Sequence, residues 1–207
     1  MRLKACLLIL LLLVIGCSSG TQATAPGGKP RPAQMKLTPI DLFEGDAAKF
    51  KLFLGPMTGA FQLAYEGDKP NVSLDIDIWK NGRKVSAAGA MGDLFYYPGE
   101  QKGSHEVELV ISIDAVTIEG KNRFSTIKVG IVGQAGSSLS TFTIPWDEKL
   151  TARGLLQDAE PRSFTADRPV HVFGMQATSS NGIQTADFSP ESLGQTEWAL
   201  VFTLRFE

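Results

Sequence analysis

The chain has 207 residues, of which 43% are hydrophobic and 20% are charged. This composition is typical of a globular protein and excludes a disordered or fibrous chain. Twenty Lys and Arg residues stand against 22 Asp and Glu residues, which gives a formal net charge of −2. A slightly acidic chain lacks the clustered cations that nucleic-acid binding and a polybasic membrane patch require, so we expect neither.

The first residues have the pattern of a secretory signal peptide. Arg2 and Lys4 are basic, and the residues from Leu7 to Ile15 form an unbroken apolar run. A basic start followed by a short apolar run and a small residue is typical of a cleaved leader. The run is too short for a membrane-spanning helix, which takes about 20 apolar residues. The sequence therefore predicts export, with residues 1–16 as the leader.

The apolar run ends in Val14-Ile15-Gly16-Cys17, which resembles the lipobox of bacterial lipoproteins. The resemblance covers residues 1–17 alone. It implies cleavage between Gly16 and Cys17 and a diacylglyceryl thioether on Cys17, whose palmitate-like chains would anchor the protein at the extracytoplasmic face of the cell membrane. If the host has an outer membrane, Ser18 in place of an aspartate implies delivery to that membrane.

Cysteine usage agrees with this interpretation. The chain has two cysteines, Cys6 within the leader and Cys17 at the expected acylation point. A mature chain that begins with an acylated Cys17 has no free thiol, so we expect no disulfide, thiolate nucleophile or cysteine metal site. The alternative, in which Cys17 is an ordinary residue of a conventional signal peptide, stays open.

Residues 17–34 are small, polar and rich in glycine, proline, serine and threonine. Such a segment cannot bury an apolar face, so its composition predicts a flexible tether. About 16 flexible residues give a reach on the order of 20–25 Å. We expect the folded domain to span residues 35–207.

Alternation of apolar and polar residues dominates this predicted domain, which indicates half-buried β-strands. Asn81-Gly82 is the strongest short hairpin signal and predicts a turn into a strand that begins at Arg83. The clear alternating segments are residues 72–78, 107–113, 127–131, 142–146 and 198–206, and weaker strands are expected at 49–54, 60–65, 94–97 and 170–177.

About nine strands separated by turns predict an all-β fold, an antiparallel β-sandwich. A closed barrel is the alternative, but unequal strand lengths favour two packed sheets. Residues 148–157 are the only short segment that we expect to be helical. Residues 87–92 and 151–168 are expected to be long connections, where loops on a rigid scaffold commonly carry function.

The catalytic motifs that the sequence matches do not lie in the secondary structure that their chemistry requires. Residues 125–128 match the Ser-x-x-Lys of penicillin-binding enzymes, which needs both side chains on one face of a helix. Here the motif lies in a β pattern, where residues three apart point to opposite faces. His105 and His171 lie far from any nucleophile elbow, and we expect one strand-end and one half-buried imidazole. We assign no catalytic residue and expect neither a metal nor a cofactor.

Asp75 and Asp77 lie two residues apart, as do the first acids of a calcium loop, but the loop pattern fails at the next positions. On a strand both carboxylates share one face, and we expect that face to be solvated. Trp79 falls on the same face and is expected to be exposed. Tyr96 and Tyr97 follow another ring between turn residues, so they cannot all point inward. Trp79, Tyr96 and Tyr97 are therefore the candidate binding surface, unless a loop or the other sheet covers them.

These observations predict a non-enzymatic, lipid-anchored lipoprotein. Its β-sandwich is expected to act as a binding or interaction module for an envelope glycan or a protein partner. Two alternatives stay open. One is an envelope hydrolase whose site assembles from distant acids and a histidine, and the other is a structural accessory subunit of a membrane complex.

Overall fold

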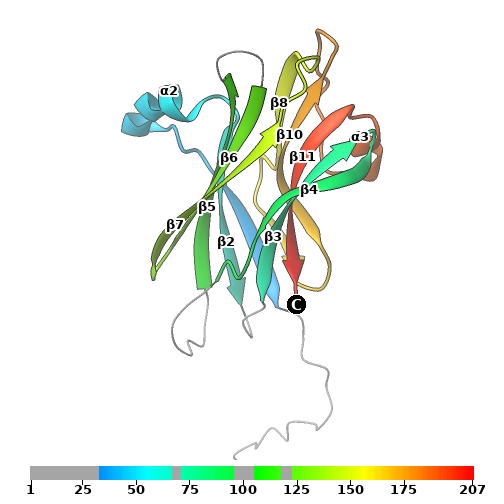
Figure 1. Cartoon of the computed structure of the whole chain (residues 1–207). Helices are drawn as coiled ribbons and strands as arrows, with labels where there is room; N and C mark the ends of the chain where they lie inside the picture. Colours follow the sequence, from blue (N-terminus) through cyan, green and yellow to red (C-terminus); the bar gives the residue numbers. More distant parts are fainter. Residues whose placement is uncertain (1–32, 67–70, 96–104, 118–122) are drawn as a thin grey trace, which may run out of the picture. The chain divides into compact units, whose positions relative to one another are not determined.

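The computed structural model describes residues 33–66, 71–95, 105–117 and 123–207. Within residues 33–207, two antiparallel β-sheets pack face to face (Figure 1). This arrangement confirms the predicted all-β sandwich. The described residues contain eleven strands, two more than the nine or so expected.

The first sheet has six strands in the order β7-β6-β5-β2-β1-β9. Their bounds are β1 (Gln34–Ile40), β2 (Thr58–Glu66), β5 (His105–Thr117), β6 (Arg123–Gly133), β7 (Gly136–Pro145) and β9 (Arg162–Thr165). The second sheet has five strands in the order β4-β3-β11-β10-β8. Their bounds are β3 (Val72–Lys80), β4 (Arg83–Met91), β8 (Ala152–Gln157), β10 (Val170–Thr178) and β11 (Trp198–Phe206).

Three short helical elements complete the described structure: η1 (Gly45–Phe50), α2 (Lys51–Leu54) and α3 (Pro190–Gly194). The side chain of Ser189 caps α3 by accepting a hydrogen bond from the backbone N–H of Ser192. None of the helices in the described part of the chain is long and apolar enough to cross a membrane.

The main core lies between the two sheets and is built by the alternating residues of the clearest predicted strands. Leu74 and Ile76 of β3 and Leu200, Phe202 and Leu204 of β11 are fully buried in it. The register places Leu74 opposite Leu204 and Ile76 opposite Phe202. Burial of a side chain of this size stabilises a fold by about 1.5–3 kcal/mol, so these alternating faces account for the pairing of the strands.

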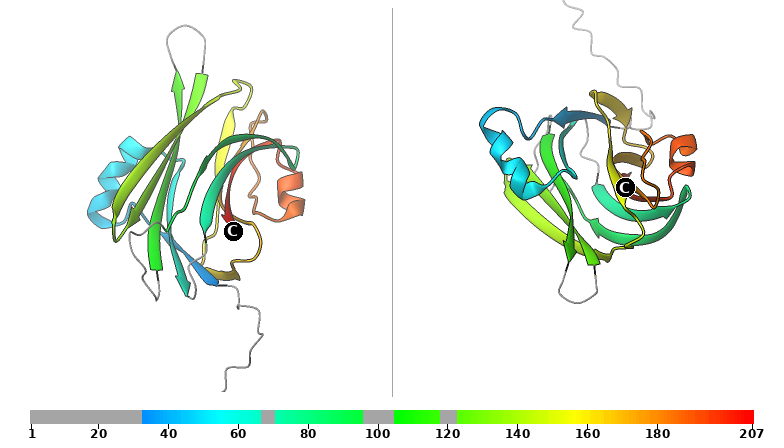
Figure 2. Two further views of the ribbon diagram at one scale, coloured as in Figure 1. Left: turned by 60° about the horizontal axis from the view of Figure 1, so that its bottom comes forward. Right: turned by 90° about the horizontal axis from the view of Figure 1, so that it is seen from above.

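A second, smaller apolar cluster lies on the outer face of the five-stranded sheet. Ala199 and Val201 of β11 point outward and are nevertheless buried, packed with Leu156 of β8 and Leu193 of α3. Figure 2 shows α3 outside this sheet, away from the six-stranded one. The connection between β10 and β11, residues 179–197, therefore covers β11, and we call it the covering segment. Both faces of β11 are buried.

The predicted hairpin at Asn81-Gly82 is confirmed. Asn81 and Gly82 both have positive φ angles, 49° and 72°, as a tight two-residue turn between antiparallel strands requires. Gly82 also touches the covering segment: a Cβ on this residue would lie 2.5 Å from the Cα of Gly194. A side chain at Gly82 is thus excluded by backbone conformation and by space.

Two expected elements have the wrong secondary structure. Residues 49–54 were expected to form a strand but belong to η1 and α2. Their apolar and basic residues alternate, yet Phe50, Leu52 and Phe53 are all exposed, so the alternation does not reflect a buried face. Conversely, the helix expected at 148–157 is wrong, because residues 152–157 form β8, which pairs with β10.

The expected long connections are also corrected. Residues 87–91 continue β4, and the span 151–168 contains both β8 and β9. In the weak strand expected at 94–97, Leu94 and Phe95 instead form a turn in which the N–H of Phe95 donates to Asp93 Oδ1. Residues 96–97 lie outside the described residues. Strand β1 was not among the expected strands, although all but its first residue lies within the predicted domain.

The two sheets meet closely along one side and separate along the other. At the first side, β4 approaches β7, where a Cβ on Gly89 would lie 2.4 Å from the ring of Phe142. At the other side, β9 pairs with β1 only over residues 34–37, and β8 pairs only with β10. The edge of β1 from Thr38 to Ile40 and the outer edge of β8 thus remain available beside an opening.

Candidate ligand cavity between the sheets

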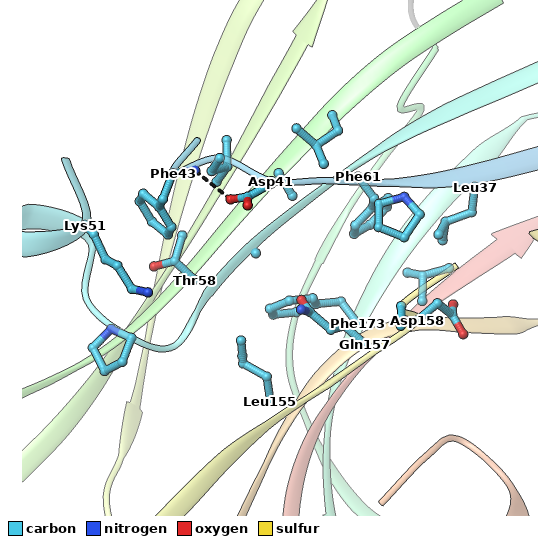
Figure 3. Close-up of a pocket in the computed structure, with 18 residues that line it drawn as sticks. Leu37, Asp41, Phe43, Lys51, Thr58, Phe61, Leu155, Gln157, Asp158 and Phe173 are labelled. Atoms are coloured by element: carbon cyan, nitrogen blue, oxygen red, sulfur yellow. Dashed lines mark hydrogen bonds between the residues drawn. The ribbon is translucent and has the colours of Figure 1, made fainter. Parts of the chain in front are cut away.

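A cavity of about 520 Å³ lies at this open side of the sandwich, and we call it the seam cavity. Its walls come from β1 and β2 of one sheet and from β8 and β10 of the other. Figure 3 shows Leu37 and Phe61 on one side, facing Leu155 and Phe173 on the other. The apolar groups of both sheets therefore form one concave surface.

A glycine at the start of β2 brings the two walls together at one end of the cavity. A Cβ on Gly59 would lie 2.5 Å from the ring of Phe173 and 2.6 Å from Oε1 of Gln157. Only a residue without a side chain permits this approach unless its neighbours shift. Gly59 therefore determines how narrow the cavity is where β2 meets β8 and β10.

Polar groups also line the cavity, among them Lys51, Thr58, Gln157 and Asp158. The hydroxyl of Thr58 donates to the carbonyl of Leu54 at 2.6 Å. Polar and apolar groups contribute about equally to the lining of the cavity. In small-molecule sites apolar groups supply burial and polar groups orient the ligand.

Asp158 is held by an arginine from β9. Its Oδ2 lies 2.8 Å from Nε of Arg162, which also donates a hydrogen bond to the carbonyl of His171. Burial raises the pKa of the Asp158 carboxyl, and the Arg162 guanidinium opposes that rise. Arg162, from β9 of the six-stranded sheet, thus connects the rim of the cavity with the backbone of β10 in the five-stranded sheet.

Trp79 lies on the outer face of β3, as the alternation predicted, and is only partly exposed there. Its ring is half-buried and contacts the second apolar cluster. The ring of His171 packs edge-on at a centroid distance of 5.5 Å. Trp79 Nε1 is buried without a hydrogen-bond partner among the described residues. The connection over this face covers Trp79, so its ring serves packing. Tyr96 and Tyr97 lie outside the described residues.

The expected solvated face around Asp75 and Asp77 is also corrected. Asp77 is only 3% exposed, and Asp75 is partly buried and forms an ion pair with Arg205 of β11. The covering segment buries this face, so the charge of Asp77 needs a partner, which is Lys84 of β4.

The histidines occupy the positions that the sequence predicted. His105 opens β5 and stacks on Tyr65 at a centroid distance of 4.8 Å. His171 is half-buried on the outer face of β10, and its Nδ1 lies 2.9 Å from the hydroxyl of Thr203. Burial lowers the pKa of His171, the carboxylate of Asp77 opposes that shift, and Arg162 adds to it.

His171, Thr203 and Asp77 combine an imidazole, a hydroxyl and a carboxylate, the groups of a nucleophilic triad. Thr203 is only 3% exposed, however, so a substrate carbonyl has no access to its hydroxyl. The carboxylate of Asp77 is paired with Lys84. The seam cavity is lined by neither histidine. The arrangement packs the outer face and lacks a place for a reacting group.

Among the residues that the structure describes, no group of three His, Cys, Asp or Glu side chains is arranged to hold a metal ion. Gly16 and Cys17, the expected cleavage and lipidation residues, lie outside the described ranges.

No protein-family model matches the chain, and comparisons with curated proteins and with solved structures found no match. The class that the described residues define is therefore structural: an antiparallel β-sandwich with a cavity between its sheets. Sequence reasoning missed this cavity because its walls include β1, which was not among the expected strands, and β8, which was expected to be helical. A signal for it exists in Gly59, directly before the strand expected at 60–65, because a glycine in or beside a strand often marks close approach of another group.

Proposed function

We propose that this protein is a lipid-anchored lipoprotein that binds a ligand with an apolar body in the seam cavity, at the extracytoplasmic face of the membrane. The observation that supports binding is the cavity of about 520 Å³, whose walls come from both sheets and offer apolar side chains together with polar groups in comparable measure. Binding is favoured over hydrolysis because His171, whose Nδ1 lies 2.9 Å from the hydroxyl of Thr203, lies on the covered outer face and does not line the cavity.

Anchoring follows from the resemblance of Val14-Ile15-Gly16-Cys17 to a lipobox. A single acyl chain gives only marginal membrane binding, whereas two chains, at about 0.8 kcal/mol per buried CH₂, hold a protein stably. A diacylglyceryl group on Cys17 would therefore suffice without a basic patch.

The anchoring test compares the full chain with two serine variants, Cys17→Ser and Cys6→Ser, in a bacterial host. The readout is the mass of the N-terminal peptide, which reports cleavage and acylation separately from membrane retention by an uncleaved leader. We expect a diacylglyceryl adduct on Cys17 in the wild type and in Cys6→Ser, and none in Cys17→Ser. A wild-type chain cleaved elsewhere, or one without the adduct, would overturn this part of the proposal.

The cavity test uses a fatty acid that carries a photoreactive diazirine, with the full chain reconstituted in nanodiscs. We expect cross-links in peptides that carry the cavity wall, competed by unlabelled fatty acid. Leu155→Trp should fill the cavity and remove these cross-links, because Leu155 lines it and is half-buried. Leu139→Trp is the matched control, because Leu139 is exposed on β7. Equal labelling of wild type and Leu155→Trp would reject the seam cavity as the site.

A further inference from the structure

Residues 45–54, comprising η1 and α2, carry a group of exposed apolar side chains, and we call them the apolar segment. Phe50, Leu52 and Phe53 are 52%, 90% and 82% exposed. Large apolar side chains that lie together in water commonly mark an interaction site. Figure 2 shows the segment projecting from the six-stranded sheet, on the side away from α3.

The end of the apolar segment is tied to the sheet. The carbonyl of Leu54 accepts hydrogen bonds from the hydroxyls of Thr58, at 2.6 Å, and of Ser112 on β5, at 2.9 Å. The N–H of Gly55 closes the last turn on the carbonyl of Lys51 at 3.0 Å. These bonds hold the C-terminal end of the segment at a defined position on the sheet, so its exposed side chains have a fixed location from which to contact a binding partner.

The charges within the apolar segment distinguish lipid from protein as the occupant. The charged residues of the segment are Asp46 in the first turn of η1 and the two lysines Lys49 and Lys51, which lie beside the exposed apolar side chains. Nζ of Lys49 lies 5.6 Å from the ring centroid of Phe50, and Nζ of Lys51 lies 5.6 Å from that of Phe43. Lysine is depleted from the cores of protein interfaces. In a bilayer interface, by contrast, its stem lies among apolar groups while its ammonium reaches anionic headgroups. The interleaved lysines therefore favour an anionic lipid surface.

The location of the apolar segment is compatible with an anchored chain. It follows β1, so it lies at the end of the sheet opposite Gln34, where β1 begins. The seven residues of β1 span roughly 23 Å, and the 16 residues from Cys17 to Pro32 reach at most roughly 55 Å when fully extended. The expected tether is thus long enough for the far end of the domain to meet the membrane that holds Cys17.

We infer that the apolar segment docks on an anionic bilayer, with Phe50, Leu52 and Phe53 inserted and Lys49 and Lys51 at the headgroups. Lys51 also lines the seam cavity. Docking therefore brings the cavity to the bilayer surface, from which a ligand with an apolar body can be drawn. The inference depends on the proposed lipid anchor in one respect, because the anchor is what brings the domain to a membrane.

The test places an environment-sensitive fluorophore on a single introduced cysteine at Leu52→Cys of the full chain. Leu139→Cys is the matched control, because Leu139 is 69% exposed and lies on β7, away from the segment. The labelled protein is bound to phosphatidylcholine vesicles with or without phosphatidylglycerol. Dye found on Cys17 would reveal a failure of acylation, which keeps the two proposals separate.

We expect a blue shift of the emission at position 52, quenching by a lipid-borne quencher, and a larger effect with phosphatidylglycerol. Position 139 should keep the emission of a water-exposed dye. The double variant Lys49→Gln, Lys51→Gln should remove the difference between the two vesicle types. Equal emission at positions 52 and 139 would overturn the inference. The inference would also be overturned if an envelope protein cross-links to the chain and shields the dye at position 52 while the lipid-borne quencher has no effect.

Discussion

Oδ1 of Asp77 lies 2.7 Å from Nζ of Lys84, and the Asp77 carboxylate is almost completely shielded from water. The two residues belong to the neighbouring strands β3 and β4. The lysine side chain remains 42% exposed, so the pair is buried on its acidic side only. A buried carboxylate is costly unless it is paired, which makes Lys84 a structural residue of the outer face.

Replacing Lys84 with methionine should therefore destabilise the protein. We expect a loss of about 1–3 kcal/mol, below the full cost of breaking a buried pair because water reaches the lysine end. Chemical denaturation of Lys84→Met measures this loss. Arg83→Met, which removes an exposed cation next to it, should change the free energy of unfolding by less than about 0.5 kcal/mol. Equal effects of the two substitutions would refute the assignment.

Gly82→Ala should destabilise the turn between β3 and β4 by about 2 kcal/mol or more, because it adds a clash with Gly194 to the strain of a positive φ. Gly45→Ala is a matched control, since Gly45 has φ +57° and nothing within 4 Å of its added Cβ. That variant should show the conformational strain alone, about 1–2 kcal/mol. Thermal unfolding of both variants separates the two costs. The prediction fails if Gly82→Ala is the milder change.

The lowered pKa of His171 predicts that the protein loses stability in mild acid. Its usual value is 6.5, and burial is the main cause of the decrease. Below pH 6.5 the unfolded chain takes up a proton at this position while the folded imidazole stays neutral, so the free energy of unfolding falls until the folded pKa is reached. Denaturation curves at several pH values should show a shallower dependence in His171→Gln.

The same pKa can be observed directly by proton NMR. The chain has two histidines, so His171→Gln assigns the remaining imidazole signal. The signal of His171 should titrate below pH 6.5. A midpoint above that value would show that the carboxylate of Asp77 outweighs burial, contrary to our expectation.

Trp79→Ala should lower stability without changing ligand cross-linking at the seam cavity. The ring packs on the second apolar cluster, and its partial burial places the expected loss at about 2–4 kcal/mol. Trp79→Phe should recover part of this loss by keeping a ring beside His171. If Trp79→Ala unfolds like the wild type yet abolishes cross-linking, Trp79 is a binding residue and the packing role is wrong.

Local alternation was sufficient to predict much of this fold. The apolar rows of β3 and β11 determine which face points inward, and Asn81-Gly82 determines the turn after β3. These features are local because the period of a strand and the dihedral angles of a tight turn depend on neighbouring residues. The acylation signal at Cys17 is likewise read from a short segment and stays a prediction.

Only the tertiary structure decided whether the outer faces and the edges of the sheets are buried or exposed. Nothing near Asp77 or Trp79 in the sequence shows that a segment more than 100 residues later covers them. The seam cavity likewise depends on β1 and β8, which lie over 100 residues apart in the chain and in different sheets. The physical reason is that burial depends on which segments meet in space. The sequence by itself determined which segments form the clearest strands and the turn between two of them, and packing decided which surfaces remain open for binding.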